Sequence, residues 1–341
     1  MMEAIRDQYG RTFRTLRVSL LSHCNFGCVY CVAGEKESRE WNAGERGEGM
    51  GGRRGHDEGL GVSEGRGRSL AAPELLEIIR RLHEQLGLGT VRLTGGEPLL
   101  YSGLVGLVEG LRSMGIPGIK LTTNGSLLER KAVALKQAGL QSINVSLDAV
   151  DEVAFARMSR RNSVERVVRG IDVALDAGLA VKVNAVVMKG MNDEQVLPLL
   201  EFAFSRGITI RFLEVMAMGH LYHHSERYLL SQQDILRMIG ERYELTPLQR
   251  ESSATARYWV TDRGQRFGII ANDSEPFCGD CDRLRLDSSG HIYGCLSNNH
   301  PIALGREEDV EVWRDKLREA LAQKQALRFT GSELSMLQIG G

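Results

Sequence analysis

The sequence predicts an α/β fold: a partial (β/α)6 barrel over residues 1–225, followed by a C-terminal α+β extension over residues 226–341. Two observations support this prediction. Short apolar runs alternate with amphipathic stretches of helical period through the first part of the chain, as expected for a parallel sheet covered by helices. The second part loses this alternation, and each part contains one triplet of cysteines, which together account for all six.

Six apolar runs are predicted to be buried parallel strands, and five amphipathic stretches between them are predicted to be helices. The strands are Leu16–Leu21, Val91–Thr94, Ile119–Thr122, Ser142–Leu147, Val181–Val187 and Thr209–Glu214. The helices are Pro73–Leu86, Leu104–Met114, Leu127–Ala138, Val164–Ala177 and Glu194–Ser205. Pro73 suits a first helical turn, while Gly139 and Gly178 suit helix C-caps. Six such units form an incomplete barrel, whose chemistry should gather at the C-terminal ends of the strands.

The C-terminal part is predicted to be mixed. Ser231–Tyr243 and Val310–Gln325 have the pattern of helices, and Arg257–Ala271 and Leu284–Leu296 read as strands joined by turns at glycines. We expect this part to pack over the open side of the partial barrel and to bring the second cysteine triplet with it.

One segment, Gly34–Arg68, is rich in Gly, Arg and Glu and nearly lacks apolar residues. Such a stretch cannot bury enough surface to offset its ordering entropy, so a flexible insertion is expected. Its arginines alone would suit RNA, but its many glutamates cancel that charge.

The length and composition of the chain limit which kinds of protein it can be. A chain of 341 residues with 42% hydrophobic residues forms about two globular domains. Its 43 Lys and Arg nearly balance its 44 Asp and Glu, which argues against a nucleic-acid or acidic-membrane partner. The N-terminus lacks the apolar core of a signal peptide, and no apolar run reaches the ~20 residues of a membrane span. We therefore expect a cytoplasmic protein whose clustered cysteines bind metal.

The first triplet is Cys24-x3-Cys28-x2-Cys31, in a loop after the first predicted strand. Three thiolates leave one position of a metal centre open, where a small molecule can bind. Thiolate-only ligation favours an iron–sulfur cluster or zinc. Structural zinc would need His23 to bend back to the metal that the adjacent Cys24 binds. Three unrelated buried cysteines are the other alternative.

The second triplet is Cys278-x2-Cys281-x13-Cys295. A zinc site completed by His291 or His300 is the alternative to an open cluster here. Arg283 and Arg285 follow Cys281 directly, and residues i and i+2 of an extended segment project on the same side. Two guanidinium groups beside an open iron would suit a polyanion such as a nucleoside triphosphate, although a solvent-facing pair is the simpler explanation.

The run Cys24–Cys31, CNFGCVYC, resembles the signature of the radical S-adenosylmethionine (SAM) superfamily. The resemblance implies a [4Fe-4S] cluster whose open iron binds SAM and cleaves it to a 5′-deoxyadenosyl radical. It also implies that SAM contacts Tyr30, Gly96 in TGGEP, Ser146 in NVSLD and Met216 in RFLEVM. Taken alone, the glycines also suit an ordinary turn, and a Met after a strand is usually core.

The whole arrangement resembles the molybdenum cofactor biosynthesis protein A family, the GTP 3′,8-cyclases. The motifs are the first triplet, TGGEP, LTTNG, INVSLDA, VKVN, IRFLEVM, FCGDCDRLRL, YGCL and the terminal Gly340-Gly341. The chain departs from the family at LSHCN (residues 21–25), at Cys31-Val32-Ala33 and in Gly34–Arg68. The resemblance implies a lyase that forms 3′,8-cyclo-7,8-dihydro-GTP in the first step of molybdenum cofactor biosynthesis. The radical would remove the 3′-hydrogen of GTP, and C3′ would then attack C8.

The family resemblance also assigns individual residues and partners. A second [4Fe-4S] cluster would bind the guanine base, and the Gly340-Gly341 tail would act in catalysis, although it also suits a frayed end. An electron donor and a downstream cyclic pyranopterin monophosphate synthase would be partners of a monomer or homodimer. A peptide-modifying radical SAM enzyme and a non-enzymatic metal-binding regulator remain as alternatives. The implied GTP contacts are Arg17, Arg92, Thr122, Lys182, Arg283, Leu284 and Arg285.

Overall fold

The computed structural model describes residues 5–34, 69–305 and 309–339. The expected flexible insertion lies, apart from Gly34, outside the described residues, as do Gly340 and Gly341. The strands are β1 (Thr15–Ser19), β2 (Thr90–Thr94), β3 (Gly118–Thr123), β4 (Ser142–Ser146), β5 (Ala180–Val187), β6 (Thr209–Glu214), β7 (Leu245–Pro247), β8 (Arg257–Thr261), β9 (Arg266–Ile270), β10 (Arg283–Leu286), β11 (His291–Tyr293) and β12 (Ile302–Ala303). The helices are α2 (Ala72–Leu86), α3 (Leu104–Ser113), α4 (Leu128–Ala138), α5 (Glu152–Ser159), α6 (Val164–Asp176), α7 (Val196–Ser205), α8 (Gln232–Gly240), α9 (Val310–Ala322) and α10 (Met336–Ile339).

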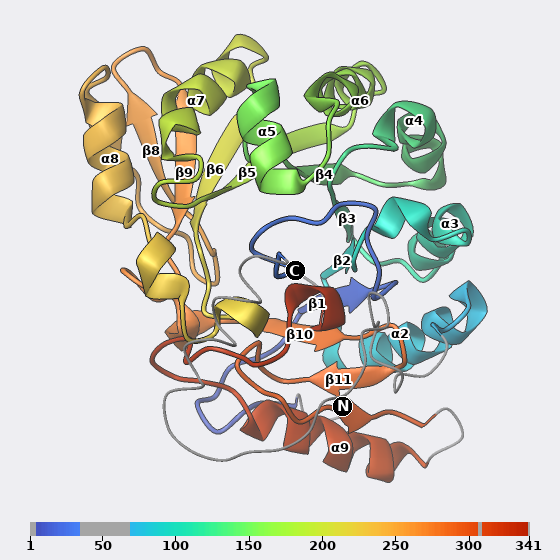
Figure 1. Ribbon diagram of the computed structural model, residues 1–341. Coiled ribbons are helices and arrows are strands. Elements are labelled where there is room, and N and C mark those ends of the chain that lie inside the picture. Colours follow the sequence, from blue (N-terminus) through green and yellow to red (C-terminus); the bar gives the residue numbers. More distant parts are fainter. Residues whose placement is uncertain (1–4, 35–68, 306–308, 340–341) are drawn as a thin grey trace, which may run out of the picture.

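All strands belong to one sheet, in the order β12-β11-β10-β1-β2-β3-β4-β5-β6-β9-β8-β7. Strands β1 to β6 are parallel, which confirms the six predicted β/α units and the partial barrel. The sheet curves, and the helices α2 to α7 lie on its outside (Figure 1).

The C-terminal part extends the sheet at both edges. Strand β10 pairs in parallel with β1, and β9 pairs in parallel with β6, so the parallel array continues past the six predicted strands. The remaining strands β7, β8, β11 and β12 pair antiparallel at the edges. This part therefore contributes strands to both edges of the partial barrel.

The two faces of the sheet differ in polarity because strand residues alternate between faces. In β1, Leu16 and Val18 are fully buried against the helix layer, while Arg17 between them points to the inner face. Helix α2 supplies the other half of this contact with Leu75, Ile78 and other apolar residues. The hydrophobic core thus lies between sheet and helices, and the interior of the curve is left for polar side chains.

Small differences from the predicted elements have local causes. Helix α5 was not predicted; it begins at Asp151, whose carboxylate accepts a hydrogen bond from the backbone N–H of Ala154 (2.9 Å). The predicted helix at Glu194 begins as a short 3-10 turn before α7.

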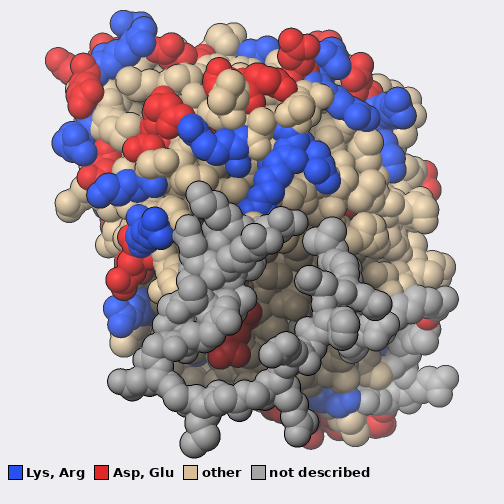
Figure 2. Space-filling model, in the orientation of Figure 1, with Lys and Arg blue, Asp and Glu red and all other residues tan. Residues whose placement is uncertain are grey.

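Figure 2 shows Lys and Arg side chains interspersed with Asp and Glu side chains over the upper part of this face. Within the described chain, no helix has the length and apolar character needed to cross a membrane.

Candidate active site

A row of basic side chains crosses four neighbouring strands on the inner face of the sheet. Arg285 on β10 is in register with Arg17 on β1, which is in register with Arg92 on β2, and Arg92 with Lys120 on β3. Like charges directly opposite one another destabilise a sheet. Burial and the neighbouring arginines hold the pKa of Arg17 well below its usual value. The same causes lower the pKa values of Arg92 and Arg285 to about 10.

This cationic row lines a cavity of about 530 Å³ inside the curve of the sheet. Eight Lys and Arg side chains face the cavity, against the two carboxylates of Glu251 and Asp282. Lys182 and Arg266 are exposed and the other six cations are buried or half-buried, and such an excess of positive charge is costly unless an anion accompanies it. The eight basic residues are Arg17, Arg92, Lys120, Lys182, Arg211, Arg266, Arg283 and Arg285.

The structure brings together six of the seven residues that the sequence assigned to GTP. Thr122 and the five basic residues line the cavity, whereas Leu284 does not. The Leu284 side chain is fully buried in the hydrophobic core, although its neighbours Arg283 and Arg285 both line the cavity.

The sequence analysis missed three basic residues of the cavity: Lys120, Arg211 and Arg266. The period of two would have identified Lys120, because it precedes Thr122 by two residues on β3. Arg211 on β6 donates from Nε to the side-chain oxygen of Asn184 (2.9 Å), which is its register partner on the neighbouring strand β5.

Two guanidinium nitrogens at this cavity lack hydrogen-bond partners among the described residues. They are Nη2 of Arg211 and Nη2 of Arg283, and both are buried. Buried donors are almost always satisfied in folded proteins, so each of these atoms indicates a missing acceptor. An anionic ligand in the cavity would supply it.

The second cysteine triplet opens onto the same cavity, since Cys278, Cys281 and Cys295 all line it. Burial raises the pKa of the Cys278 thiol to about 11. Burial alone would also raise the pKa of Cys281, but Lys324 and Arg283 outweigh it and lower the pKa to about 7. A thiol that is ionised near neutral pH is a ready metal ligand.

The first cysteine triplet lies beyond the end of β1 and does not line the cavity. Its loop is held by hydrogen bonds from Arg161 Nε to the carbonyl of Asn25 (2.6 Å) and from Arg160 Nη1 to that of Val32 (2.8 Å). Two donors point at the Cys24 sulfur: the backbone N–H of Phe26 (3.3 Å) and Nδ2 of Asn124 (3.6 Å). Such N–H···S contacts stabilise a thiolate bound to iron.

Carboxylates accompany this first triplet. Burial raises the pKa of Glu97 to about 7 and that of Asp148 to about 6. Burial, followed by neighbouring charges that include Asp148, raises the pKa of Cys28 well above its usual value, and burial raises that of Cys31 to about 12. The two triplets thus lie in opposite electrostatic surroundings.

Gly96 brings the TGGEP turn into contact with the first triplet. Its N–H donates to the carbonyl of Leu21 (2.6 Å), and a Cβ at this position would lie 1.9 Å from the carbonyl oxygen of His23. No side chain fits there. The adjacent Glu97 carboxylate accepts hydrogen bonds from Thr123 Oγ1 (2.6 Å) and the backbone N–H of Asn124 (2.8 Å), which joins the ends of β2 and β3.

The other residues assigned to SAM surround the same loop less tightly. The Tyr30 hydroxyl donates to Asp148 (2.8 Å), and Ser146 is the last, half-buried residue of β4. Met216 follows β6 and is the only one of the four assigned residues that lines the cavity. It packs against the C-terminal segment around Met336, which leads toward Gly340 and Gly341.

The donor sets fit iron–sulfur clusters better than single ions. Among the residues that the structure describes, no three His, Cys, Asp or Glu side chains are arranged around one metal ion. A cubane cluster binds each thiolate to a different iron, so its ligands are spread around a larger centre. Each triplet offers three thiols, with hydrogen-bond donors at Cys24 in the first and at Cys281 in the second, which suits such a centre.

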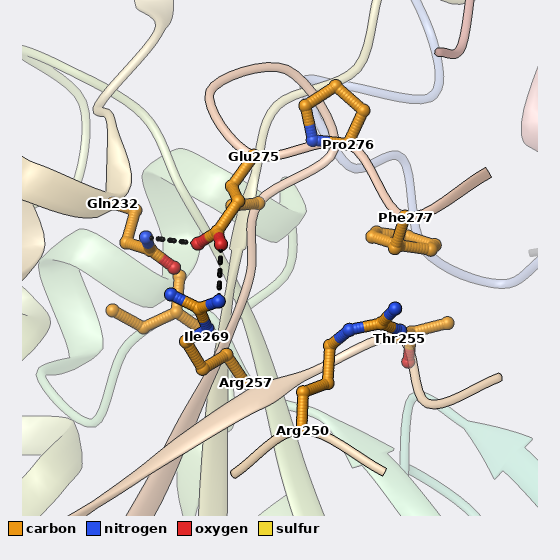
Figure 3. Close-up of a pocket in the computed structure, with 9 residues that line it drawn as sticks. Gln232, Arg250, Thr255, Arg257, Ile269, Glu275, Pro276 and Phe277 are labelled. Atoms are coloured by element: carbon orange, nitrogen blue, oxygen red, sulfur yellow. Dashed lines mark hydrogen bonds and ion pairs between the residues drawn. The ribbon is translucent and has the colours of Figure 1, made fainter. Parts of the chain in front are cut away.

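A smaller pocket of about 200 Å³ lies beside the main cavity and shares Thr255 and Phe277 with it (Figure 3). Its charges are paired internally. Arg257 forms an ion pair with Glu275 (2.6 Å), which also accepts a hydrogen bond from Gln232 (2.7 Å), and Arg250 pairs with Asp280 (2.7 Å). This pocket therefore has no excess charge to offer a ligand, in contrast to the main cavity.

Family models and curated relatives match most of this chain. Residues 18–203 match the radical SAM superfamily, and residues 208–331 match the family Molybdenum Cofactor Synthesis C. A GTP 3′,8-cyclase of Synechocystis sp. is 34% identical over 341 residues, covering 100% of this chain and 96% of that protein. A GTP 3′,8-cyclase of Staphylococcus epidermidis is 36% identical over 300 residues, covering 87% of this chain and 82% of that protein.

Solved structures show the same fold. The crystal structure of Streptococcus suis SuiB bound to S-adenosylmethionine has a TM-score of 0.62 and 16% identity, covering 91% of this chain and 68% of that one. Native anSMEcpe with bound AdoMet has a TM-score of 0.56 and 14% identity, covering 91% and 81%. At these identities the likeness concerns the fold alone.

Proposed function

Because this chain belongs to the radical SAM superfamily and, within it, to the GTP 3′,8-cyclase family, we propose that its cationic cavity is the GTP site. The enzyme is a lyase that converts GTP to 3′,8-cyclo-7,8-dihydro-GTP in molybdenum cofactor biosynthesis. The single observation that carries the proposal is the Arg285-Arg17-Arg92-Lys120 row beside the second triplet. A triphosphate would neutralise that row and supply acceptors for the orphaned nitrogens of Arg211 and Arg283.

The roles of the protein's own residues follow from their places. Arg17, Arg92, Lys182, Arg283 and Arg285 hold the anion, Thr122 donates a hydroxyl to it, and the backbone at Leu284 adds a polar contact. Cys278, Cys281 and Cys295 hold the second [4Fe-4S] cluster at the wall of the same cavity. GTP is thereby oriented between this cluster and the strand ends, which is the positioning that an intramolecular ring closure requires.

The first site is proposed to hold the second reactant, SAM. Cys24, Cys28 and Cys31 hold the first [4Fe-4S] cluster, which when loaded supplies the electron that cleaves SAM to its radical. Tyr30, Gly96, Ser146 and Met216 orient SAM, and Met216 also lines the GTP cavity. Gly340 and Gly341 are proposed to act in catalysis, since the chain that precedes them packs around Met216 and Met218.

We propose that residues 1–225 form the domain that binds SAM. Residues 226–341 form the region that holds the second cluster, binds the substrate and ends in the Gly-Gly tail. We also propose an external electron donor, a downstream cyclic pyranopterin monophosphate synthase that consumes the product, and a monomer or homodimer. A cytoplasmic location is proposed because six free thiols suit a reducing compartment.

The test is an anaerobic assay with SAM, a reductant and GTP deuterated at the 3′ position. The cyclisation removes the 3′ deuterium, transfers it to 5′-deoxyadenosine, and then adds one electron and one proton to the ring-closed nucleotide. We expect deuterated 5′-deoxyadenosine and an equal amount of a nucleotide isomer that has lost the label, both detected by mass spectrometry. ATP deuterated at 3′ is the control, and transfer from ATP but not from GTP would refute the proposal.

A further inference from the structure

Lys324, just after helix α9, is a buried cation beside a ligand of the second triplet. Its side chain is 5% exposed, and its Nζ lies 3.6 Å from Sγ of Cys281. The same ammonium group donates to the carbonyl of Arg283 and lies 4.9 Å from the centre of the Phe13 ring. Within residues 5–34, 69–305 and 309–339, no carboxylate forms an ion pair with it. A buried ammonium group without a carboxylate needs another anion nearby.

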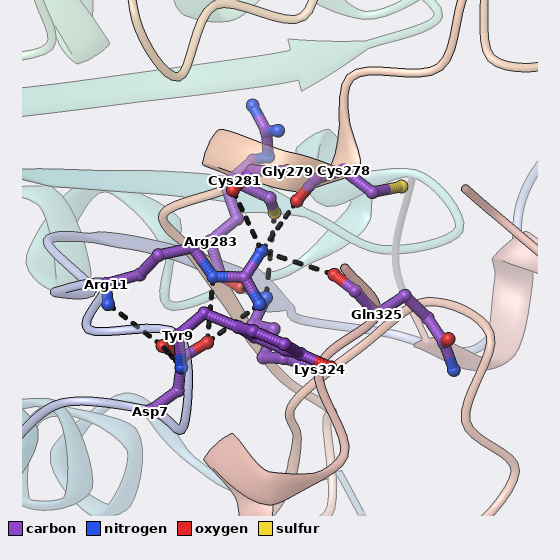
Figure 4. Close-up of polar contacts among 9 residues, drawn as sticks. All are labelled: Asp7, Tyr9, Arg11, Cys278, Gly279, Cys281, Arg283, Lys324 and Gln325. Carbon is purple, nitrogen blue, oxygen red and sulfur yellow. Dashed lines mark hydrogen bonds and ion pairs between the residues drawn. The ribbon is translucent and has the colours of Figure 1, made fainter. Parts of the chain in front are cut away.

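The N-terminal segment fixes this geometry through Arg11 (Figure 4). Arg11 Nη1 donates to the carbonyls of Cys278 (2.6 Å) and Gln325 (3.2 Å), so one guanidinium joins the triplet loop to the residue after Lys324. Asp7 holds Arg11 in turn, accepting from its Nε (2.8 Å) and its backbone N–H (2.9 Å). Lys324 and the cysteine loop therefore cannot separate without breaking this network.

The first triplet has no counterpart of Lys324. In the part of the chain that the structure describes, the groups that hydrogen-bond its sulfur atoms are neutral, and they include Nδ2 of Asn124 and the backbone N–H of Phe26 at Cys24 and the Tyr30 side chain at Cys28. The nearest charged groups that act on its thiols include the carboxylates Glu97 and Asp148. Among the described residues, a cation thus contacts a ligand sulfur at the second site, whereas Arg160 and Arg161 at the first loop donate to carbonyls.

We propose that Lys324 is a positioning residue that raises the reduction potential of the second cluster through its charge and its N–H···S contact with Cys281. The inference rests on the proposed function, because it needs a cluster at the second triplet. Reduction adds a negative charge to a cluster, and a cation or hydrogen bond at a ligand sulfur stabilises that reduced form. The carboxylates near the first cluster act in the opposite direction.

The experiment compares anaerobically reconstituted wild-type protein with Lys324→Met, Lys324→Arg and Lys136→Met. Lys136 is the matched control, because it is an exposed lysine on α4 that also donates to a backbone carbonyl, that of Gly178 (2.6 Å). Redox titration followed by electron paramagnetic resonance measures each cluster's midpoint potential. The signal of the second cluster is the one that is absent from Cys281→Ser.

We expect Lys324→Met to shift the potential of the second cluster to a more negative value and to leave that of the first unchanged. Lys324→Arg should keep the wild-type potential, and Lys136→Met should have no effect. If Lys324→Met loads less iron while Lys324→Arg loads fully, the potential is measured on the second cluster that remains, and a wild-type value there overturns the proposal.

Two further outcomes overturn it. One is an unchanged potential in a fully loaded Lys324→Met protein. The other is equal loss of iron in Lys324→Met and Lys324→Arg, which would mean that Lys324 acts only through packing. If wild-type protein itself forms no second cluster, it is the proposed function that fails.

Discussion

The two cysteine triplets supply the same three ligands but lie in opposite electrostatic fields. The first is accompanied by Glu97 and Asp148, and burial holds the pKa of Cys31 at about 12. The second is accompanied by Lys324 and Arg283, which lower the pKa of Cys281 to about 7. SAM carries a positive sulfonium, whereas GTP is a polyanion. The surroundings of each triplet, more than its ligands, therefore indicate which molecule belongs there.

Arginines hold both loops, but the first also depends on close backbone contact. Arg160 and Arg161 donate to its carbonyls, and Gly96 leaves no space for a side chain against His23. The second is held by charged side chains, through Arg11 at Cys278 and through Arg250, which pairs with Asp280. Substitutions should therefore damage the first loop through steric overlap and the second through loss of charge.

The largest effect is expected from removing one ligand of each triplet. Wild-type protein should bind about eight irons per chain, and Cys28→Ser and Cys281→Ser should each reduce this to about four. Cys28→Ser should abolish SAM cleavage, because it removes the radical source. Cys281→Ser should retain uncoupled formation of 5′-deoxyadenosine but lose deuterium transfer from GTP. Iron assay and product analysis measure both, and loss of all iron in Cys281→Ser would contradict the separation of the two sites.

Next in size is Gly96→Ala, which tests the steric basis of the first loop. The added Cβ overlaps the His23 carbonyl, so we expect a loss of about 1–3 kcal/mol of unfolding free energy and of iron from the first site only. Gly106→Ala is the control: no atom lies within 4 Å of its Cβ on helix α3, and a gain of up to about 1 kcal/mol is expected. Denaturant unfolding measures the stability of both variants, and iron analysis measures their cluster content. Equal stability and equal iron content in the two variants would exclude the steric explanation.

Arg17→Met tests the charge excess of the GTP cavity. Removing one buried cation from the row relieves repulsion, so the ligand-free protein should become more stable. Its affinity for GTP should fall about 10- to 100-fold, the equivalent of one charge-assisted hydrogen bond. Arg14→Met is the control, an exposed arginine that donates to the carbonyl of Gly87 (3.1 Å). Calorimetric titration with GTP measures the affinity, and reduced stability together with unchanged affinity would mean that Arg17 is structural.

The smallest and most local effect is the reactivity of single thiols in iron-free protein. Alkylation requires the thiolate, whose fraction rises as pH passes the pKa. Cys281 should therefore be half-reactive near pH 7, while Cys31 should remain protected until about pH 12. Pulses of iodoacetamide across pH 6–9, with peptide mass mapping, measure both profiles. If Cys281 and Cys31 were alkylated with the same pH dependence, the predicted difference between their pKa values would be wrong.

Much of this architecture could be read from the sequence. The six β/α units were predictable because a parallel strand covered by helices shows apolar runs bounded by turns, and β6 was placed to the residue. The pairing of β10 with β1 could not be predicted, because no local pattern records which distant strand lies at an edge. Helix α5 was missed because it is only eight residues long.

The site was predictable to the extent that residue type reveals chemistry. Cysteine spacing and the Arg283/Arg285 pair indicated the second centre, whereas Arg17 and Arg92 were assigned by the family resemblance. Lys324 gave no signal, because a lone lysine after an amphipathic helix normally lies in solvent. Its burial depends on the segment around Arg11 and Phe13, from the opposite end of the chain.

The pairing of β10 with β1 also bears on the order in which the protein is made. Strand β1 lies near the start of the chain, but its partner β10 is synthesised only near the end. The first cysteine loop is therefore translated long before the residues that surround the second triplet. Each nascent chain must therefore spend most of its synthesis with one iron site translated and the other absent, and the substrate cavity comes into existence only when the two ends of the polypeptide meet.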